Sequence, residues 1–427
     1  MKQLKDIFGR KSSRWLFLEL VLVTFALWWA FDPILVSAYV THLPLGYDAE
    51  RLVKLEVATS VTREEQDKHF GDFLDEEELL LQKARELDDV ELAYSAFTNP
   101  MGFGVVGMSC NYFVDGDTLT GWRYEFAPES RMFEVYGIQS LTPEVPTHEL
   151  THDCEDDVSV IITRTMAMGL YGTTDVAGRK LTGRVHTYDD GDFKWVNRDY
   201  RIRAVVEDVR HYEHDRDLAC IFICSDGYQS NTPIILRLRN GVNAERFIQS
   251  HQRQVETELT TEHYYVRSMQ SCLDAQSDAS RRTNVGRTTR RNLLIAAFFA
   301  VNLSFGVFGT LLMYTRQRRE ETGIRRAFGA TKRNVFLGFL REAWLLTTIS
   351  VIVGCIIEFQ FAAAGGLSDE YAGVHSATHF WFDSFGSHFL VVSACVYLII
   401  LCAVLIGTAI PAWRISRSEI TESLKDE

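Results

Sequence analysis

The sequence predicts a membrane protein with four transmembrane α-helices and an α+β extracytoplasmic domain. Four stretches are apolar enough to cross a bilayer, which takes about 20 helical residues; they are 15–36, 293–314, 344–364 and 389–410. The long segment between the first two alternates strand-like runs, helical patterns and Gly turns. With 427 residues, 46% of them hydrophobic, the chain can also fill a sizeable core.

The first apolar stretch is expected to be a retained anchor. Basic residues precede it, as they precede a cleavable signal peptide. Its apolar run from Trp15 to Val36 is longer than a typical signal core, and no clear small-x-small cleavage site follows it. We therefore expect it to stay in the membrane.

Basic residues predict that both termini are cytoplasmic. Sixteen Lys and Arg lie near the membrane on that side, against seven on the other. Five of the seven form a cluster in 281–291 that runs against the rule. We thus expect a multi-pass protein of the cell (inner) membrane. Its predicted order is a cytoplasmic amphipathic segment 1–14, first helix 15–36, extracytoplasmic domain 37–292, second helix 293–314, cytoplasmic coupling segment 315–343, third helix 344–364, short extracytoplasmic loop 365–388, fourth helix 389–410 and cytoplasmic tail 411–427.

Local patterns predict the elements of the extracytoplasmic domain. Asp75, followed three residues later by Glu78, is typical of a capping box that starts a helix. Thr163 can cap a short helix that ends near Tyr171, and Gly172 suits its end. Another helix should follow the Gly turn at 240–241. Strands are expected at 51–59, 90–97, 158–162, 200–209 and 218–226, and another begins at Ile234 and ends before the Gly turn.

The eight cysteines indicate no disulfide framework. Five of them lie in the predicted extracytoplasmic domain, where disulfides are permitted, so at least one has no partner within the chain. Cys220 and Cys224 sit in one strand, about 13 Å apart, which is too far to bridge. The pairing of the others stays open.

His148, Glu149 and His152 spell the His-Glu-x-x-His pattern of zinc peptidases. Such a site needs a continuous helix with an apolar face. Pro143 and Pro146 precede the motif, polar residues follow it, and no third ligand is evident downstream. We interpret it as a surface loop, with adventitious metal binding and a catalytic zinc site as alternatives.

Charge and motifs exclude other functions. A net charge of −13 argues against a nucleic-acid binder. The stretch "GRKSS" at Gly9 lacks the first Gly of a phosphate-binding loop. We therefore expect no ATPase activity and no bound cofactor in this chain.

The cytoplasmic coupling segment is expected to contain a short amphipathic helix with breaks at Gly323 and Gly329. Ile324, Ala327 and Phe328 share one apolar face, while Arg325 and Arg326 point elsewhere. Such a helix either lies on anionic lipid or docks into a groove of a soluble partner.

The stretch "ETGIRRAFGATKRNVFLGFLREA" resembles the signature of MacB/FtsX-type ABC transporter permeases. The matching positions are Glu321, Gly323, Ile324, Arg325, Arg326, Ala327, Gly329, Ala330 and Glu342. Thr322 replaces the usual aliphatic residue. The C-terminal stretch is similar to the family's ending at Pro411, Ala412, Ser416 and Leu424, but Ile415 and Ile420 depart from it. The segment from Val158 resembles the family's outer domain moderately.

The resemblance implies a permease that works in pairs, either two copies or two related chains. Each would dock on a separate ATP-binding subunit, which holds the ATP, and would transmit its motion to the outer domain for export or extrusion of a substrate. The residues expected to couple the permease to the ATP-binding subunit are Glu321, Gly323, Ile324, Arg325, Arg326, Ala327, Phe328, Gly329 and Ala330. Efflux would add a periplasmic adaptor and an outer-membrane channel as partners.

Two alternatives remain for the function. One is a mechanotransmitter that regulates a cell-wall hydrolase without transport, and the other is a ligand sensor.

Four polar residues lie in the predicted membrane stretches, and one of them, Asn302, could form a hydrogen bond between helices. Glu19, Asp32 and Glu358 lie nearer the ends, where we expect them to reach the interface in structural roles.

Overall fold

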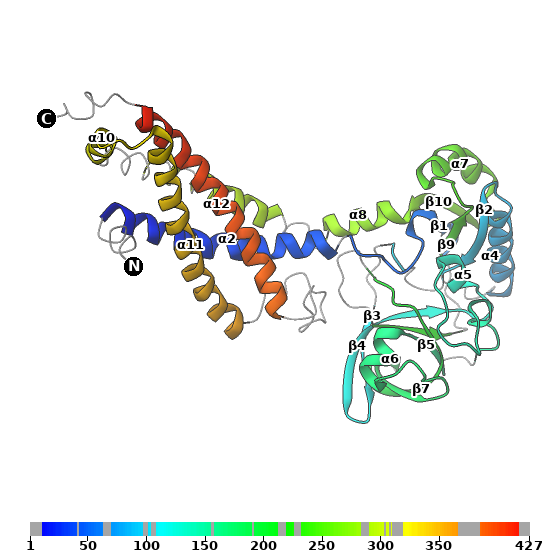
Figure 1. Ribbon diagram of the computed structural model, residues 1–427. Coiled ribbons are helices and arrows are strands. Elements are labelled where there is room, and N and C mark those ends of the chain that lie inside the picture. Colours follow the sequence, from blue (N-terminus) through cyan, green and yellow to red (C-terminus); the bar gives the residue numbers. More distant parts are fainter. Residues whose placement is uncertain are drawn as a thin grey trace. The chain divides into compact units, whose positions relative to one another are not determined.

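The computed structural model divides the chain into two compact units (Figure 1). The helical unit combines Met1–Tyr39, Val285–Tyr371 and Ala377–Glu427, and the large domain comprises Val40–Asn284 with Ala372–Ser376. The structure describes residues 11–40, 42–62, 70–96, 101–103, 108–154, 158–189, 192–211, 219–225, 232–282, 290–302, 305–306, 309, 319–365 and 385–417. Outside them lie the first ten residues of the predicted N-terminal segment 1–14, most of the predicted loop 365–388 and the last ten residues of the predicted tail.

Three long helices dominate the helical unit: α2 (Lys11–Val40), α11 (Lys332–Gly365) and α12 (Phe385–Arg417). Each contains a stretch long and apolar enough to cross a membrane. They correspond to the first, third and fourth predicted membrane helices. The second falls partly outside the described residues, and 290–302 are helical. Membrane helices plus a mixed α/β domain are thus present as predicted.

Close contacts join the three helices. Leu20 and Leu27 of α2 share a buried cluster with Val396 of α12. Trp28 Nε1 donates a hydrogen bond to Ser393 Oγ at 3.0 Å. On α11, a Cβ at Gly354 would lie 2.7 Å from Thr24 Cβ, so only glycine allows this approach between α2 and α11.

A four-stranded antiparallel sheet forms one half of the large domain, in the order β10-β1-β9-β2. Helices α4 and α7 bury Phe73, Leu80 and Phe247 in one core with this sheet. The helix α4 starts at or before Phe70, so the prediction that Asp75 caps it is wrong. Phe73 is buried and extends the apolar face toward the N-terminus. The elements are β1 (Leu52–Thr59), α4 (Phe70–Arg85), β2 (Val90–Ser95), β9 (Ile234–Leu238), α7 (Ala244–Glu258) and β10 (Tyr264–Ser271).

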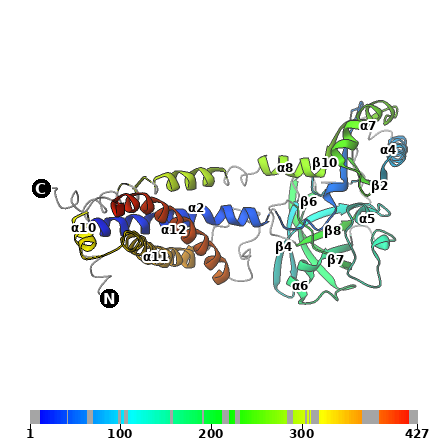
Figure 2. The same ribbon diagram turned by 45° about the horizontal axis from the view of Figure 1, so that its top comes forward.

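A closed six-stranded barrel forms the other half, in the order β3-β4-β8-β5-β7-β6 (Figure 2). Strand β8 runs parallel to β4, and β5 runs parallel to β7. Alternate residues of β5 and β8 enter two different buried clusters. The elements are β3 (Met108–Val114), β4 (Asp117–Phe126), α5 (Met132–Tyr136), β5 (Ser159–Thr163), α6 (Arg164–Tyr171), β6 (Lys180–Asp189), β7 (Asp192–Val206) and β8 (Cys220–Cys224), and α8 (Cys272–Arg282) follows β10.

The start of α6 differs in detail from the prediction. Thr163 occupies the cap position, but its hydroxyl accepts a hydrogen bond from Cys220 N of β8 at 3.0 Å. Asp208 Oδ1 instead accepts from Thr165 N at 2.7 Å, so the cap comes from a distant segment. The end agrees with the prediction, because Gly172 follows Tyr171 with a φ of 69°.

Candidate coupling segment

The coupling segment contains one short helix, α10 (Arg319–Ala327), and the start of α11. Thr322 is 5% exposed and Gly323 is also buried. The prediction that Gly323 breaks the helix is wrong, because it lies inside α10. A residue without a side chain is suited to a buried helix face that lies close to its neighbours.

A tight turn connects α10 to α11. Gly329 has a φ of 94°, and no atom lies within 4 Å of where its Cβ would be, so backbone conformation is what requires glycine here. Ala330 N donates to Arg325 O and Gly329 N donates to Arg326 O, both at 3.0 Å, which is a Schellman motif. Thr331 Oγ1 then accepts from Asn334 N at 3.2 Å and caps α11. The helix stop predicted at Gly329 is confirmed.

The apolar face of α10 points away from the rest of the helical unit. Ile324 is 50% exposed, Phe328 is 89% exposed and Ala327 is also exposed. Arg325 is exposed and Arg326 is half-buried. A water-soluble helix usually buries its apolar face. The reverse arrangement here leaves an apolar face open to the surroundings of the chain.

A small core fixes the turn to the end of α12. Val335, Phe339 and Ala412 are buried together, and Ala330 packs against them. The turn, the start of α11 and the end of α12 therefore pack together, and α10 is attached to them through the turn. Glu321 lies in α10, but its side chain is outside the part that the structure describes. Glu342 is half-buried on α11.

Sequence reasoning missed a buried hydrogen-bonded contact between α2 and α12. Asp32 and His388 are 2% and 1% exposed, and His388 Nε2 lies 2.5 Å from Asp32 Oδ1. Glu358 of α11 is 4% exposed and interacts electrostatically with Asp32. The expectation that Asp32 and Glu358 reach the interface is therefore wrong, because both lie inside the helix bundle. The sequence carries no signal for a contact between residues 356 positions apart.

The His-Glu-x-x-His motif does not lie on an α-helix. Thr147–Glu149 form a single 3₁₀ turn, and the chain then turns again. The side chains of His148 and His152 are 67% and 54% exposed, and His152 forms an ion pair with Glu129. The two imidazoles thus lack the shared helical face that a peptidase site requires. The interpretation as a surface loop fits this geometry.

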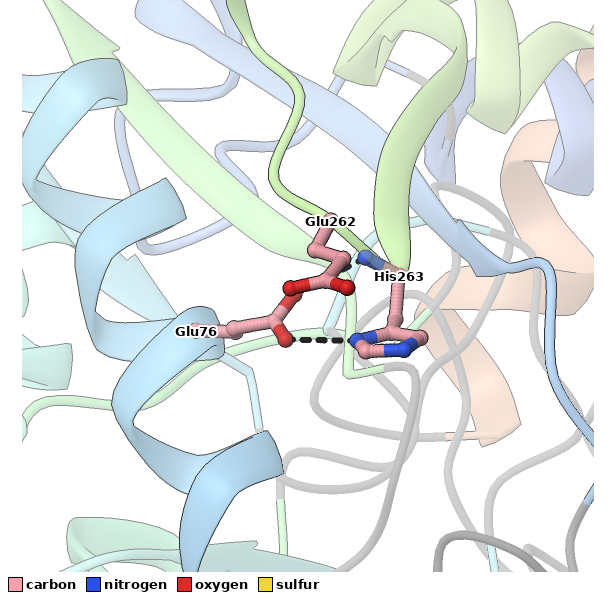
Figure 3. Close-up of side chains that lie close together, drawn as sticks. All are labelled: Glu76, Glu262 and His263. Carbon is pink, nitrogen blue, oxygen red and sulfur yellow. Dashed lines mark hydrogen bonds and ion pairs between the residues drawn. The ribbon is translucent and has the colours of Figure 1, made fainter.

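A different group of metal-ligand types lies at the edge of the four-stranded sheet (Figure 3). Ligand atoms of Glu76, Glu262 and His263 lie within 4.8 Å of one another. Glu76 Oε1 is 2.6 Å from His263 Nδ1, and Oε2 accepts hydrogen bonds from Thr261 Oγ1 at 2.6 Å and His263 N at 2.9 Å. Burial raises the pKa of Glu76, but the hydrogen bonds from Thr261 and His263 outweigh it, so the net pKa is lowered. The carboxylate thus already serves as the cap of the turn that starts β10.

Comparison with known proteins finds a family match in the C-terminal part of the chain. Residues 293–420 match the family described as FtsX-like permease C-terminal. The pyoverdine export ATP-binding/permease protein PvdT of Pseudomonas entomophila (strain L48) is 34% identical over 98 residues, which are 22% of this chain and 15% of that protein. The macrolide export ATP-binding/permease protein MacB of Bradyrhizobium diazoefficiens is 29% identical over 140 residues, 32% of this chain and 20% of that protein.

A relative from Bacillus subtilis (strain 168), the ABC transporter permease YtrF, is 28% identical over 120 residues, 28% of this chain and 26% of that protein. The matched regions therefore span about a quarter or less of the length of these relatives. The family match covers the coupling segment and the helices α11 and α12. Residues 293–420 thus match the FtsX-like permease C-terminal family, which confirms the resemblance to MacB/FtsX-type ABC permeases that the loop signature predicted.

Proposed function

We propose that this chain is the permease subunit of a MacB/FtsX-type ABC transporter. It would dock on a separate ATP-binding subunit and transmit that subunit's ATP-driven motion through the helical unit to an extracytoplasmic large domain, for export of a substrate. The family match of residues 293–420 supports the permease assignment. The relatives PvdT and MacB are export ATP-binding/permease proteins, which supports export, and the relative YtrF is an ABC transporter permease, which supports a permease subunit.

One observation carries the proposed docking site: the exposed apolar face of α10. Ile324 and Phe328 present this face on a short helix that a Schellman turn joins to α11. A helix of this kind can enter an apolar groove of a soluble partner, and a stiff attachment would pass a displacement on to α11. Arg325 and Arg326 flank the face and would meet acidic groups at the rim.

Substitution of Phe328 tests this docking site. In the full chain, purified with the ATP-binding subunit that accompanies it in its native membrane, Phe328→Asp should weaken the complex at least about tenfold, because it places a charge in an apolar contact. Leu337→Asp on α11 is the matched control, since Leu337 is 48% exposed but lies beyond the turn at Gly329, away from the face formed by Ile324 and Phe328. Equal loss in both variants, or in neither, would show that α10 is not the docking element. The purified chain alone should hydrolyse no ATP.

A second function is a mechanotransmitter without transport, which would use the same docking site. The identity of the extracytoplasmic protein that co-purifies with the chain distinguishes transport from mechanotransmission without transport. An adaptor and an outer-membrane channel would indicate efflux, whereas a cell-wall hydrolase would indicate regulation. Both readings place the chain in a dimer of permeases in the cell membrane.

A further inference from the structure

The turn before β10 places a glutamate and a histidine against α4 (Figure 3). Glu262 and His263 immediately precede β10, whereas Glu76 lies on α4, 187 positions before His263. Thr261 N donates to Tyr264 O at 2.8 Å, and Tyr264 N donates to Thr261 Oγ1 at 3.1 Å. These bonds fix the backbone of the turn and with it the positions from which the two side chains start.

The two oxygens of Glu76 have different surroundings. Oε2 accepts from Thr261 Oγ1 and from His263 N, and so holds the turn. Oε1 lies 2.6 Å from His263 Nδ1 instead. The imidazole also packs edge-on against Phe73, with ring centroids 5.1 Å apart. Glu76 Oε1 and His263 Nδ1 are therefore held together on a fixed support, and Oε1 is not needed for the turn.

Glu262 brings a second carboxylate to this pair. One ligand atom from each of Glu76, Glu262 and His263 lies within 4.8 Å of the other two, and Figure 3 shows the Glu262 carboxylate next to that of Glu76. Ligands bound to one Zn²⁺ at about 2.1 Å are about 3.4 Å apart in tetrahedral geometry. Glu262 is exposed and can make the small movement that closes this difference.

Electrostatics favours a cation between the two carboxylates. Burial raises the pKa of Glu76, but the hydrogen bonds from Thr261 and His263 lower it more, so Glu76 is ionised at neutral pH. Two ionised carboxylates at this separation repel each other, and a cation between them reverses the sign of the interaction.

We propose that Glu76, Glu262 and His263 bind one divalent transition-metal ion of the Zn²⁺ class, which links α4 to the turn before β10. One imidazole nitrogen with two carboxylate oxygens suits Zn²⁺, whereas Mg²⁺ and Ca²⁺ prefer oxygen ligands alone. The ion takes the place of the proton between His263 Nδ1 and Glu76 Oε1, and the neutral imidazole keeps its proton on Nε2. Glu76 Oε2 continues to hold the turn. A water completes the four ligands.

Metal titration of the full chain in detergent tests the proposal. The protein would first be stripped with a chelator and carry His148→Gln and His152→Gln, which remove two exposed imidazoles in another loop. Zn²⁺ would then be titrated against a chromophoric chelator. We expect Glu262→Gln and His263→Gln each to weaken binding at least about tenfold, because each removes a direct ligand. Glu256→Gln, an exposed carboxylate on α7, is the matched control and should leave the affinity unchanged.

Two further readouts locate the ion. Zn²⁺ should raise the unfolding midpoint of the parent protein more than that of Glu262→Gln, because an ion that binds the folded state stabilises it. Cu²⁺ bound in place of Zn²⁺ should show coupling to one imidazole nitrogen in its electron paramagnetic resonance spectrum, and His263→Gln should abolish that coupling.

Equal affinity for Zn²⁺ in the parent protein, Glu262→Gln and His263→Gln would overturn the proposal. A Cu²⁺ spectrum that His263→Gln leaves unchanged would overturn it as well, because the ion would then lie elsewhere. Glu262 is exposed, so its glutamine variant keeps the test independent of any effect that His263→Gln has on the packing against Phe73.

Discussion

At the residue scale, the buried pair Asp32–His388 has the largest expected effect on stability. Both side chains are almost fully enclosed within the helical unit. Removing one partner of such a pair leaves a buried group without its compensation. A mutation here therefore tests whether the pair holds α2 and α12 together.

His388→Leu should destabilise the helical unit by about 3–5 kcal/mol, because Asp32 then stays buried without the imidazole. The double variant Asp32→Leu/His388→Leu should recover most of this loss, since neither partner is then left buried without the other. Thermal unfolding of the full chain in detergent would measure both. If the double variant were as unstable as the single one, the pair would matter for packing rather than for charge.

Glu76 gives the large domain a predicted acid dependence. Its pKa is lowered in the folded state, so its stabilising contribution is complete above the unfolded value of about 4.3. This stabilising contribution is lost as the pH falls through the lower pKa that Glu76 has in the folded state. Glu76→Gln should cost about 1–2 kcal/mol at pH 7, from weakened hydrogen bonds to Thr261 and His263.

The difference between wild type and Glu76→Gln should shrink toward zero as the pH falls below the folded pKa. Unfolding midpoints of both full chains, measured between neutral and acidic pH, would report this difference in stability. Glu262→Gln is the control, because Glu262 is exposed and should shift the midpoint little. A cost for Glu76→Gln that did not change with pH would contradict the assigned role of the carboxylate.

At the element scale, the joint between α10 and α11 depends on one glycine. Gly329→Ala should cost about 1 kcal/mol, because its φ of 94° is unfavourable for any residue with a Cβ. We also expect weaker association with the ATP-binding subunit, since α10 would be reoriented. Gly338→Ala is the matched control: nothing lies within 4 Å of its Cβ and its helical φ suits alanine. A complex weakened equally by both substitutions would argue against a special joint.

The joint also shows which elements local sequence can predict. Apolar runs predicted the long helices, and Gly329 and Gly172 predicted two helix ends, because these signals act over one or two turns. The assignments of Gly323 as a break and Asp75 as a cap were wrong. In both cases tertiary burial, of Gly323 against the bundle and of Phe73 against the sheet, overrides the local preference.

At the scale of the whole molecule, the predicted topology places the large domain and the coupling segment on opposite sides of the membrane. In a variant without native cysteines, Asp115→Cys at the exposed β3–β4 turn should react with a membrane-impermeant maleimide in intact cells. Asn334→Cys near the start of α11, also exposed, should react only after the membrane is permeabilised. Labelling of both positions in intact cells would reject the predicted orientation.

Two features of this chain can be predicted without its structure: the apolar helices of membrane length and the loop signature of the FtsX-like permeases. Both depend on composition and on spacings of a few residues. Two features became visible only in the folded chain: six strands close a barrel, and Asp32 meets His388. These contacts join segments up to 356 residues apart, and the periodicity of a strand or helix carries no information about its distant neighbour. The same holds for α10, whose apolar pattern was visible in the sequence but whose exposure depended on how the helical unit packs.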